Sequence, residues 1–204
     1  MSNRSKVYFS SDITPEKVLE LYKLLGVTLP GNVAVKVHSG EKGNQNFLRP
    51  DFWRPVIEHV GGTVVECNTA YNGMRNTTEK HLQLFAEHGW TDDHDQFLES
   101  MADAAASVVE LFKGNIVYIN VMKNMSVDCD CCAVAEDPCI ADIGILISTD
   151  PIAIDQACVD LVYACSDPGK PHLIERIESR NGIHTVEAAA ELGFGSREYE
   201  LITV

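Results

Sequence analysis

The stretch Asp142–Tyr163, DIGILISTDPIAIDQACVDLVY, decides the fold class. Its first part, Ile143 to Ser148, is a short apolar run that predicts a buried strand. Asp150 and Pro151 follow, and these residue types are favoured at a helix N-cap and at the first helical position. From Ile152 to Cys165 the apolar residues recur with helical spacing. The stretch therefore predicts a buried strand followed directly by a helix.

The rest of the chain alternates in the same way. We expect further strands at residues 6–10, 32–37, 63–67, 115–121 and 199–202, and further helices at 15–25, 51–60, 77 or 78–88, 96–113, 171–179 and 186–192. This alternation predicts an α/β fold with a largely parallel or mixed sheet flanked by helices. The 204 residues fit a single α/β domain, 1–204.

The composition excludes several function classes. A net charge of −14 argues against binding to nucleic acid or to an anionic membrane surface. No apolar run approaches the roughly 20 residues needed to cross a bilayer. Residues 1–6 are not followed by the apolar segment of a signal peptide, so we expect a cytoplasmic protein. Seven cysteines, an odd number, argue against a disulfide framework and leave core packing, metal ligation or redox chemistry.

The densest group of chemical side chains lies in a loop between the expected strands 115–121 and 143–148. The segment Asp128–Cys132 reads DCDCC, and Cys139 follows shortly after. Thiolates suit zinc or an iron–sulfur cluster, although the spacing matches neither a zinc ribbon nor a ferredoxin. An acidic surface loop with incidental thiols is the alternative. We expect a metal ion, zinc or an iron–sulfur cluster here, with these ligands: Cys129, Cys131 and Cys132, helped by Cys139 or His38.

A second candidate site is the loop at Lys36–Pro50, KVHSGEKGNQNFLRP. Its glycines free backbone N–H groups, and Lys36, Lys42 and Arg49 add positive charge to an acidic protein. Such a loop could hold a carboxylate or a phosphate. His38 ends the preceding strand and is equally well explained as a ligand, an acid–base group or a hydrogen-bonded loop residue.

Other polar and thiol side chains are better explained by structure. Cys158 and Cys165 lie on the apolar face of the helix 152–165, so we expect both to pack in the core. Cys67, at the end of a strand, stays open between core and site. Asp155 complements the helix dipole, and a role in a site stays open for it too. The acidic run 92–95 is expected to be a solvated helix start.

Four long motifs together resemble the bacterial and archaeal domain-of-unknown-function 362 family: NVAVKVHSGEKGNQNFLRP, VDCDCC, DIGILISTDPIAIDQACVDLVY and IERIESRNGIHTVEAAAELGFGSREYEL. Many relatives in that family resemble iron–sulfur proteins because they carry ferredoxin-type cysteine motifs. No C-x-x-C-x-x-C run exists in this chain, so those clusters do not carry over. The resemblance carries over the DCDCC cysteines and, in the N-terminal loop, His38 with residues 44–50. It thereby adds Asn44 to the expected binding residues.

The resemblance also implies a long central segment between Trp90 and Asp95 that is absent here. We therefore expect a trimmed or missing segment at the 90/91 seam, where the composition changes abruptly.

Three functions follow from the sequence. The first is a metal- or iron–sulfur-binding redox protein that uses the DCDCC loop. The second is a binding module for a small anionic metabolite, and the third is a thiol redox switch at Cys131 and Cys132. The partner would be a small molecule or a redox protein, and a homo-oligomer stays open, as does enzymatic turnover.

Overall fold

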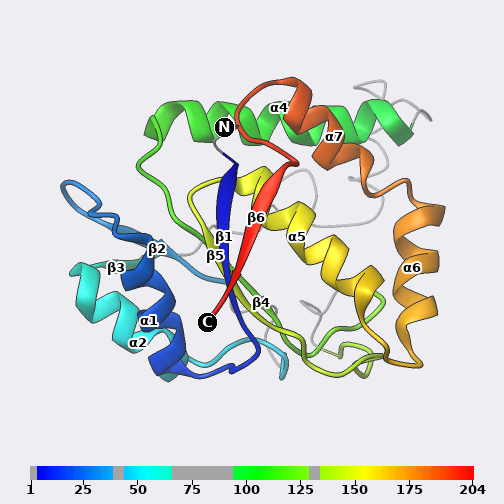
Figure 1. Ribbon diagram of the computed structural model, residues 1–204, viewed down its shortest axis with the longest axis horizontal. Helices are drawn as coiled ribbons and strands as arrows, with labels where there is room; N and C mark the ends of the chain where they lie inside the picture. The colour runs from blue at the N-terminus through cyan, green and yellow to red at the C-terminus, as the bar shows by residue number, and fades with distance from the viewer. Residues whose placement is uncertain (1–3, 39–43, 66–93, 129–133) are drawn as a thin grey trace, which may run out of the picture.

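The computed structural model describes residues 4–38, 44–65, 94–128 and 134–204. Within these ranges the chain forms an α/β domain (Figure 1). The strands are β1 (Ser5–Ser10), β2 (Ala34–Lys36), β3 (Thr63–Val65), β4 (Tyr118–Met122), β5 (Gly144–Ser148) and β6 (Tyr199–Thr203). The helices are α1 (Pro15–Leu25), α2 (Pro50–Val60), α4 (His94–Phe112), α5 (Pro151–Ala164), α6 (Lys170–Ser179) and α7 (His184–Glu191). The expected helix at 77 or 78–88 and Cys67 lie outside the described residues.

The main sheet is mixed, with the strand order β4-β5-β1-β6. Among the described strands of this sheet, β5 pairs antiparallel with both β4 and β1, and β1 pairs parallel with β6. Strands β2 and β3 form a separate parallel pair. The prediction of a mixed sheet is confirmed. A largely parallel main sheet is not what forms, because β4 is connected to β5 without a described helix between them, which brings the chain back antiparallel.

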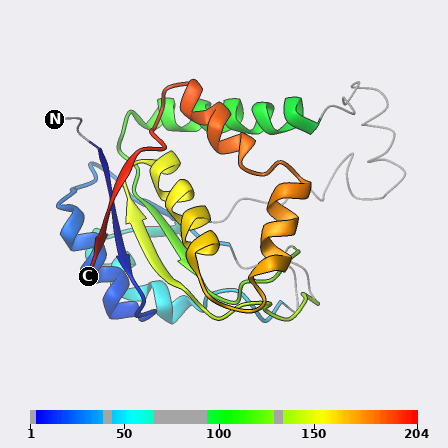
Figure 2. The ribbon, with the colours of Figure 1, turned by 45° about the vertical axis from the view of Figure 1, so that its right-hand side comes forward.

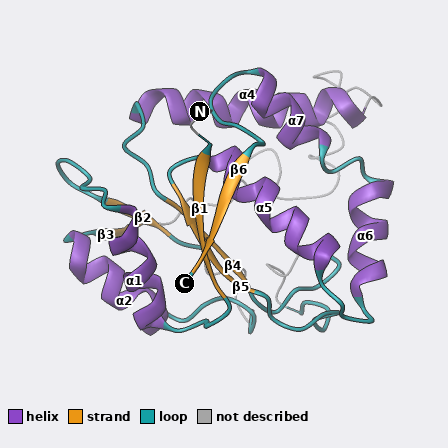
Figure 3. Cartoon of the chain, in the orientation of Figure 1, coloured by secondary structure: helices purple, strands orange, loops and turns teal. Residues whose placement is uncertain are grey.

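Strand β5 is at the centre of the fold and is buried throughout. Ile145 and Ile147 point to the face covered by α1 and α2, whereas Leu146 packs against α5 on the other face. The strands of the main sheet therefore lie between α1 and α2 on one face and α5 on the other (Figures 2 and 3). Burial on both faces explains why this strand is apolar without alternation.

Local chemistry defines the ends of the helices as expected. Thr14 caps α1 through a hydrogen bond from Lys17 N, and Gly26 ends the helix with a φ of 64°. Asp150 caps α5, with Pro151 at the first helical turn. Cys158, in α5, and Cys165, which follows its last residue, pack against the core, as predicted. No helix within the described ranges is long and apolar enough to pass through a membrane.

Candidate functional site

The chain between β4 and β5 is closed at its base by backbone hydrogen bonds. Ile143 N donates to Met122 O at 2.9 Å, and Cys139 N donates to Met125 O at 2.8 Å. The segment that leaves β4 and the segment that enters β5 are therefore held side by side. We call the segment 125–139 the cysteine loop, because it contains Cys129, Cys131, Cys132 and Cys139. The first three of these lie outside the described residues.

Polar side chains reinforce the closure. Asp142 accepts a hydrogen bond from Lys123 Nζ at 2.6 Å and another from Asn124 N at 2.9 Å. Burial of Asp142 alone would raise its pKa, but the bonds to Lys123 and Asn124 outweigh this desolvation and lower the pKa. Asp142 therefore stays ionised and fixes the residues that leave β4 to those that enter β5.

Helix α6 and the turn before it form polar contacts with residues at both ends of the cysteine loop. Asp167, just before α6, accepts hydrogen bonds from Ala141 N at 3.0 Å and from Gly169 N at 2.8 Å. Arg176, in α6, forms an ion pair with Asp128 at 2.9 Å. Residues near the start of the loop and just after its end are therefore held in place by α6 and by the turn that precedes it.

Cys139 belongs to the base of the loop. Its thiol donates a hydrogen bond to Met125 O at 3.3 Å, and the side chain packs against the core. Burial raises the pKa of this thiol. Cys139 is thus a protonated thiol with a structural contact in this conformation.

The described part of the N-terminal loop, residues 44–50, contacts Asn124, the residue before the cysteine loop. Asn44 is buried, and its Oδ1 accepts hydrogen bonds from Asn46 N at 2.8 Å and Phe47 N at 3.0 Å. Asn124 Nδ2 donates to Asn46 O at 3.4 Å, across 78 residues of sequence. This bond connects the segment 44–50 to the residue that precedes the cysteine loop. Arg49 is exposed, with its guanidinium 4.1 Å from the Phe47 ring.

The remaining predicted site residues lie at or after the end of β2. Lys36 is exposed at the end of β2, and His38 is exposed two residues later. Lys42 lies outside the described residues. Among the residues that the structure describes, no three His, Cys, Asp or Glu side chains are grouped so that they could hold a metal ion.

A polar cluster between β4 and α5 was not predicted. Asn120 Nδ2 donates to Asp155 Oδ1 at 2.8 Å and lies 3.4 Å from Cys158 Sγ. Desolvation raises the pKa of Asp155, and it raises the pKa of Cys158 to about 12. The hydroxyl of Tyr118 is buried and has no hydrogen-bond partner within the described ranges. Asn120 interrupts an otherwise apolar strand, and this signal could have pointed to the cluster.

The cluster does not provide a reactive thiol. A pKa of about 12 keeps Cys158 protonated at neutral pH. Its role in the core, predicted from the sequence, is therefore the chemically consistent one.

Residues 91–160 match the family model described as domain of unknown function, DUF362. The matched range includes α4, β4, the cysteine loop, β5 and most of α5. Comparisons with curated proteins and with solved structures gave no match. The match over residues 91–160 supports the assignment to the DUF362 family that the sequence motifs predict.

Proposed function

We propose that the protein binds a metal ion or an iron–sulfur cluster through Cys129, Cys131 and Cys132 and acts in electron transfer. The observation that carries this proposal is the closed base of the cysteine loop. Because Met125 and Cys139 are held together, the intervening thiols are confined to a short span of chain. Confinement lowers the entropy that three ligands lose when they bind one group.

The cations beside the loop also support the proposal, because they would stabilise negatively charged thiolates. Three thiolates and the carboxylates of Asp128 and Asp130 would place several negative charges in one segment. Lys123 and Arg176 supply cations at the two flanks, where they pair with Asp142 and Asp128. Nearby cations favour the thiolate over the thiol, and the thiolate is the form that binds metal.

The contacts of Cys139 remove it from the proposed set of metal ligands. Cys139 has a raised pKa and a backbone partner, which favours its role in closing the loop. Three cysteines leave one position of a four-coordinate site for another ligand, for which His38 remains a candidate. A bound cluster would supply one-electron chemistry, and the chain itself would hold it, balance its charge and limit access of water.

The test is the metal and acid-labile sulfide content of protein purified without oxygen, together with its absorption spectrum. Wild-type protein should hold a stoichiometric metal, and C129S with C131S should lose it while far-UV circular dichroism stays unchanged. C158S and C165S are matched controls, because both thiols pack against the core. Retention of full metal content by the double variant would refute the proposal.

The second candidate is a binding module for a small anionic metabolite, with Lys36, Lys42, Asn44 and Arg49 as its binding residues. The specific observation in its favour is Arg49, whose exposed guanidinium is held by Phe47 and by Gln45 Oε1 at 3.1 Å. Metal-free folded protein that is stabilised by a carboxylate or phosphate in a thermal-shift panel would support it. The stabilisation should then be lost in R49Q. Metal-free protein without any stabilisation, but with a rapidly alkylated Cys131 or Cys132, would instead favour a thiol switch.

A further inference from the structure

Helix α4, the first element of the DUF362 match, contacts the other described elements through a small apolar cluster and a few polar side chains. It packs mainly against α7 (Figure 1). Its buried side chains are Leu98 and Ala102. Ala102 forms a small buried cluster with Ile152 and Ala189, and partly buried apolar side chains pack against this cluster: Val186, Ala188, Ala190 and Phe194. Other apolar side chains of α4 are exposed, among them Met101, Val108, Leu111 and Phe112. Polar contacts between α4 and α7 add to this small apolar cluster.

Two polar contacts connect α4 to the start of α7. Asn181 Nδ2 donates to Asp95 Oδ1 at 2.7 Å, and His184 Nε2 lies 3.1 Å from Glu99 Oε1. The other ring nitrogen, His184 Nδ1, lies 3.8 Å from Glu187 Oε2. The imidazole of His184 thus lies between a carboxylate of α4 and a carboxylate of its own helix.

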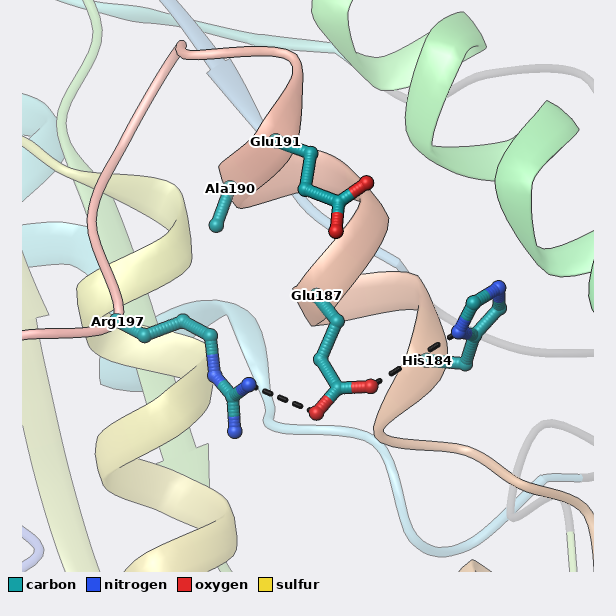
Figure 4. Close-up of a pocket in the computed structure, with 5 residues that line it drawn as sticks. All are labelled: His184, Glu187, Ala190, Glu191 and Arg197. Atoms are coloured by element: carbon teal, nitrogen blue, oxygen red, sulfur yellow. Dashed lines mark hydrogen bonds and ion pairs between the residues drawn. The ribbon is translucent and has the colours of Figure 1, made fainter.

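The charged groups around His184 are mostly acidic. Asp95 and Glu99 face it from α4, and Glu187 faces it from α7. The Arg197 guanidinium forms an ion pair with Glu187 at 2.7 Å (Figure 4). Arg197 Nε also donates a hydrogen bond to Gln156 of α5 at 2.8 Å. Glu187 is therefore connected to α5 through Arg197, and its carboxylate lies next to His184.

These same residues line a pocket between α7 and the segment before β6. Its lining consists of His184, Glu187, Ala190, Glu191 and Arg197. Three of the four charged or titratable groups in this lining are paired with one another, as the dashed lines of Figure 4 show. We therefore interpret them as one connected network that leads from α5 through α7 to α4.

We propose that the contacts of His184 with Glu99 and Glu187 hold α4 against α7 and depend on pH. We call these contacts the latch. An imidazolium donates from both ring nitrogens and attracts both Glu99 and Glu187. A neutral imidazole donates from one nitrogen only and carries no charge. Loss of the proton therefore weakens the link to one or both carboxylates and loosens α4.

The direction of the pH effect follows from the environment of His184. The hydrogen bond to Glu99 is the largest influence, and it raises the pKa of His184 above its ordinary value of 6.5, with further support from the charges of Asp95, Glu99 and Glu187. A raised pKa in the folded state means that the latch is fully engaged below pH 6.5 and is lost as the pH rises through the folded-state pKa. Helix α4 is thus predicted to loosen as the solution turns from acidic to alkaline.

The test is hydrogen exchange on the full chain between about pH 5.5 and about pH 8.5, read as protection factors of α4 amides relative to those of β5. Wild-type α4 should lose protection several-fold across this range, while β5 stays protected. In H184Q, α4 should be weakly protected at all pH values without a step. H172Q is the matched control, because His172 is exposed on α6, and it should behave as wild type.

A second variant separates the latch from a general loss of structure. E99Q keeps the size of the side chain but removes its charge, so the step should move to lower pH. The proposal is overturned if wild-type α4 shows no pH step, or if H184Q retains the wild-type step while β5 remains protected.

Discussion

At the scale of single residues, one carboxylate joins three parts of the fold. Asp150 Oδ1 accepts hydrogen bonds from Ile152 N at 2.9 Å and Ala153 N at 3.0 Å. Asp150 Oδ2 accepts from Ser5 Oγ at 2.6 Å and from Ser196 N at 3.0 Å. The cap of α5 therefore also fastens the start of β1 and the segment that leads into β6.

We predict that Asp150→Ala lowers the free energy of unfolding by about 2–4 kcal/mol, because it removes an N-cap and two further hydrogen bonds. Urea denaturation measures the change. Ser5→Ala is the matched control, since it removes only one of these bonds and should cost about 1 kcal/mol. An Asp150→Ala variant as stable as wild type would contradict this account.

The thiol of Cys158 gives a second prediction at this scale. A pKa of about 12 leaves only about one thiol in ten thousand ionised at pH 8, so alkylation of the native protein should be very slow there. Iodoacetamide labelling followed by mass spectrometry measures the rate. The same residue should react at the ordinary rate of a free cysteine after unfolding in urea, and equal rates in both states would show that the thiol is not shielded.

At the scale of elements, α6 and the cysteine loop are packed with almost no clearance. A Cβ added at Gly169 would lie 1.7 Å from the carbonyl oxygen of Cys139, which is much closer than any real contact. Only glycine at this position allows the start of α6 to lie against the returning end of the loop.

Gly169→Ala should therefore move α6 away from the loop and lower the free energy of unfolding by about 1–3 kcal/mol, the usual cost of overpacking. Thermal or urea unfolding measures this change. Gly182→Ala is the control, because its added Cβ would meet nothing closer than 3.4 Å, and it should stay within about 1 kcal/mol of wild type. Equal effects of the two substitutions would argue against a close approach at Gly169.

At the scale of the whole molecule, the net charge of −14 destabilises the compact folded state through repulsion between like charges. The ion pairs between Arg4 and Glu198, and between Arg54 and Asp51, are exposed at the surface, where such pairs contribute little to stability. Repulsion among the excess carboxylates is therefore expected to outweigh the pairs that salt would weaken.

We predict that the melting temperature rises as sodium chloride increases from a few millimolar to about 0.2 M, because the screening length falls from more than about 30 Å to less than about 10 Å over this range. Differential scanning calorimetry at pH 7.5 measures the shift. An uncharged osmolyte at equal osmolality serves as the control for effects other than screening. A melting temperature that falls with salt would mean that the surface ion pairs outweigh the net repulsion.

Much of the fold could be predicted because its signals are local. The strand Gly144–Ser148 and the cap at Asp150 depend on residues next to one another, as does the end of α1 at Gly26. Strand β4 begins at Tyr118, three residues later than predicted, because Lys113 and Gly114 take positive φ values and Asn115 still bonds back to Phe112. Such turns depend on a few backbone angles, which periodicity does not reveal.

The sequence by itself determined the α/β class, the burial of β5 and the position of the cysteine loop between two strands. Tertiary structure alone decided the strand order β4-β5-β1-β6 and the partners of the polar side chains. Asn124 meets Asn46 across 78 residues, Arg176 meets Asp128 across 48, and His184 meets Glu99 across 85. Composition and spacing report on neighbours in the chain, whereas these contacts depend on how separate helices and strands pack together, and this depends on burial over the whole core.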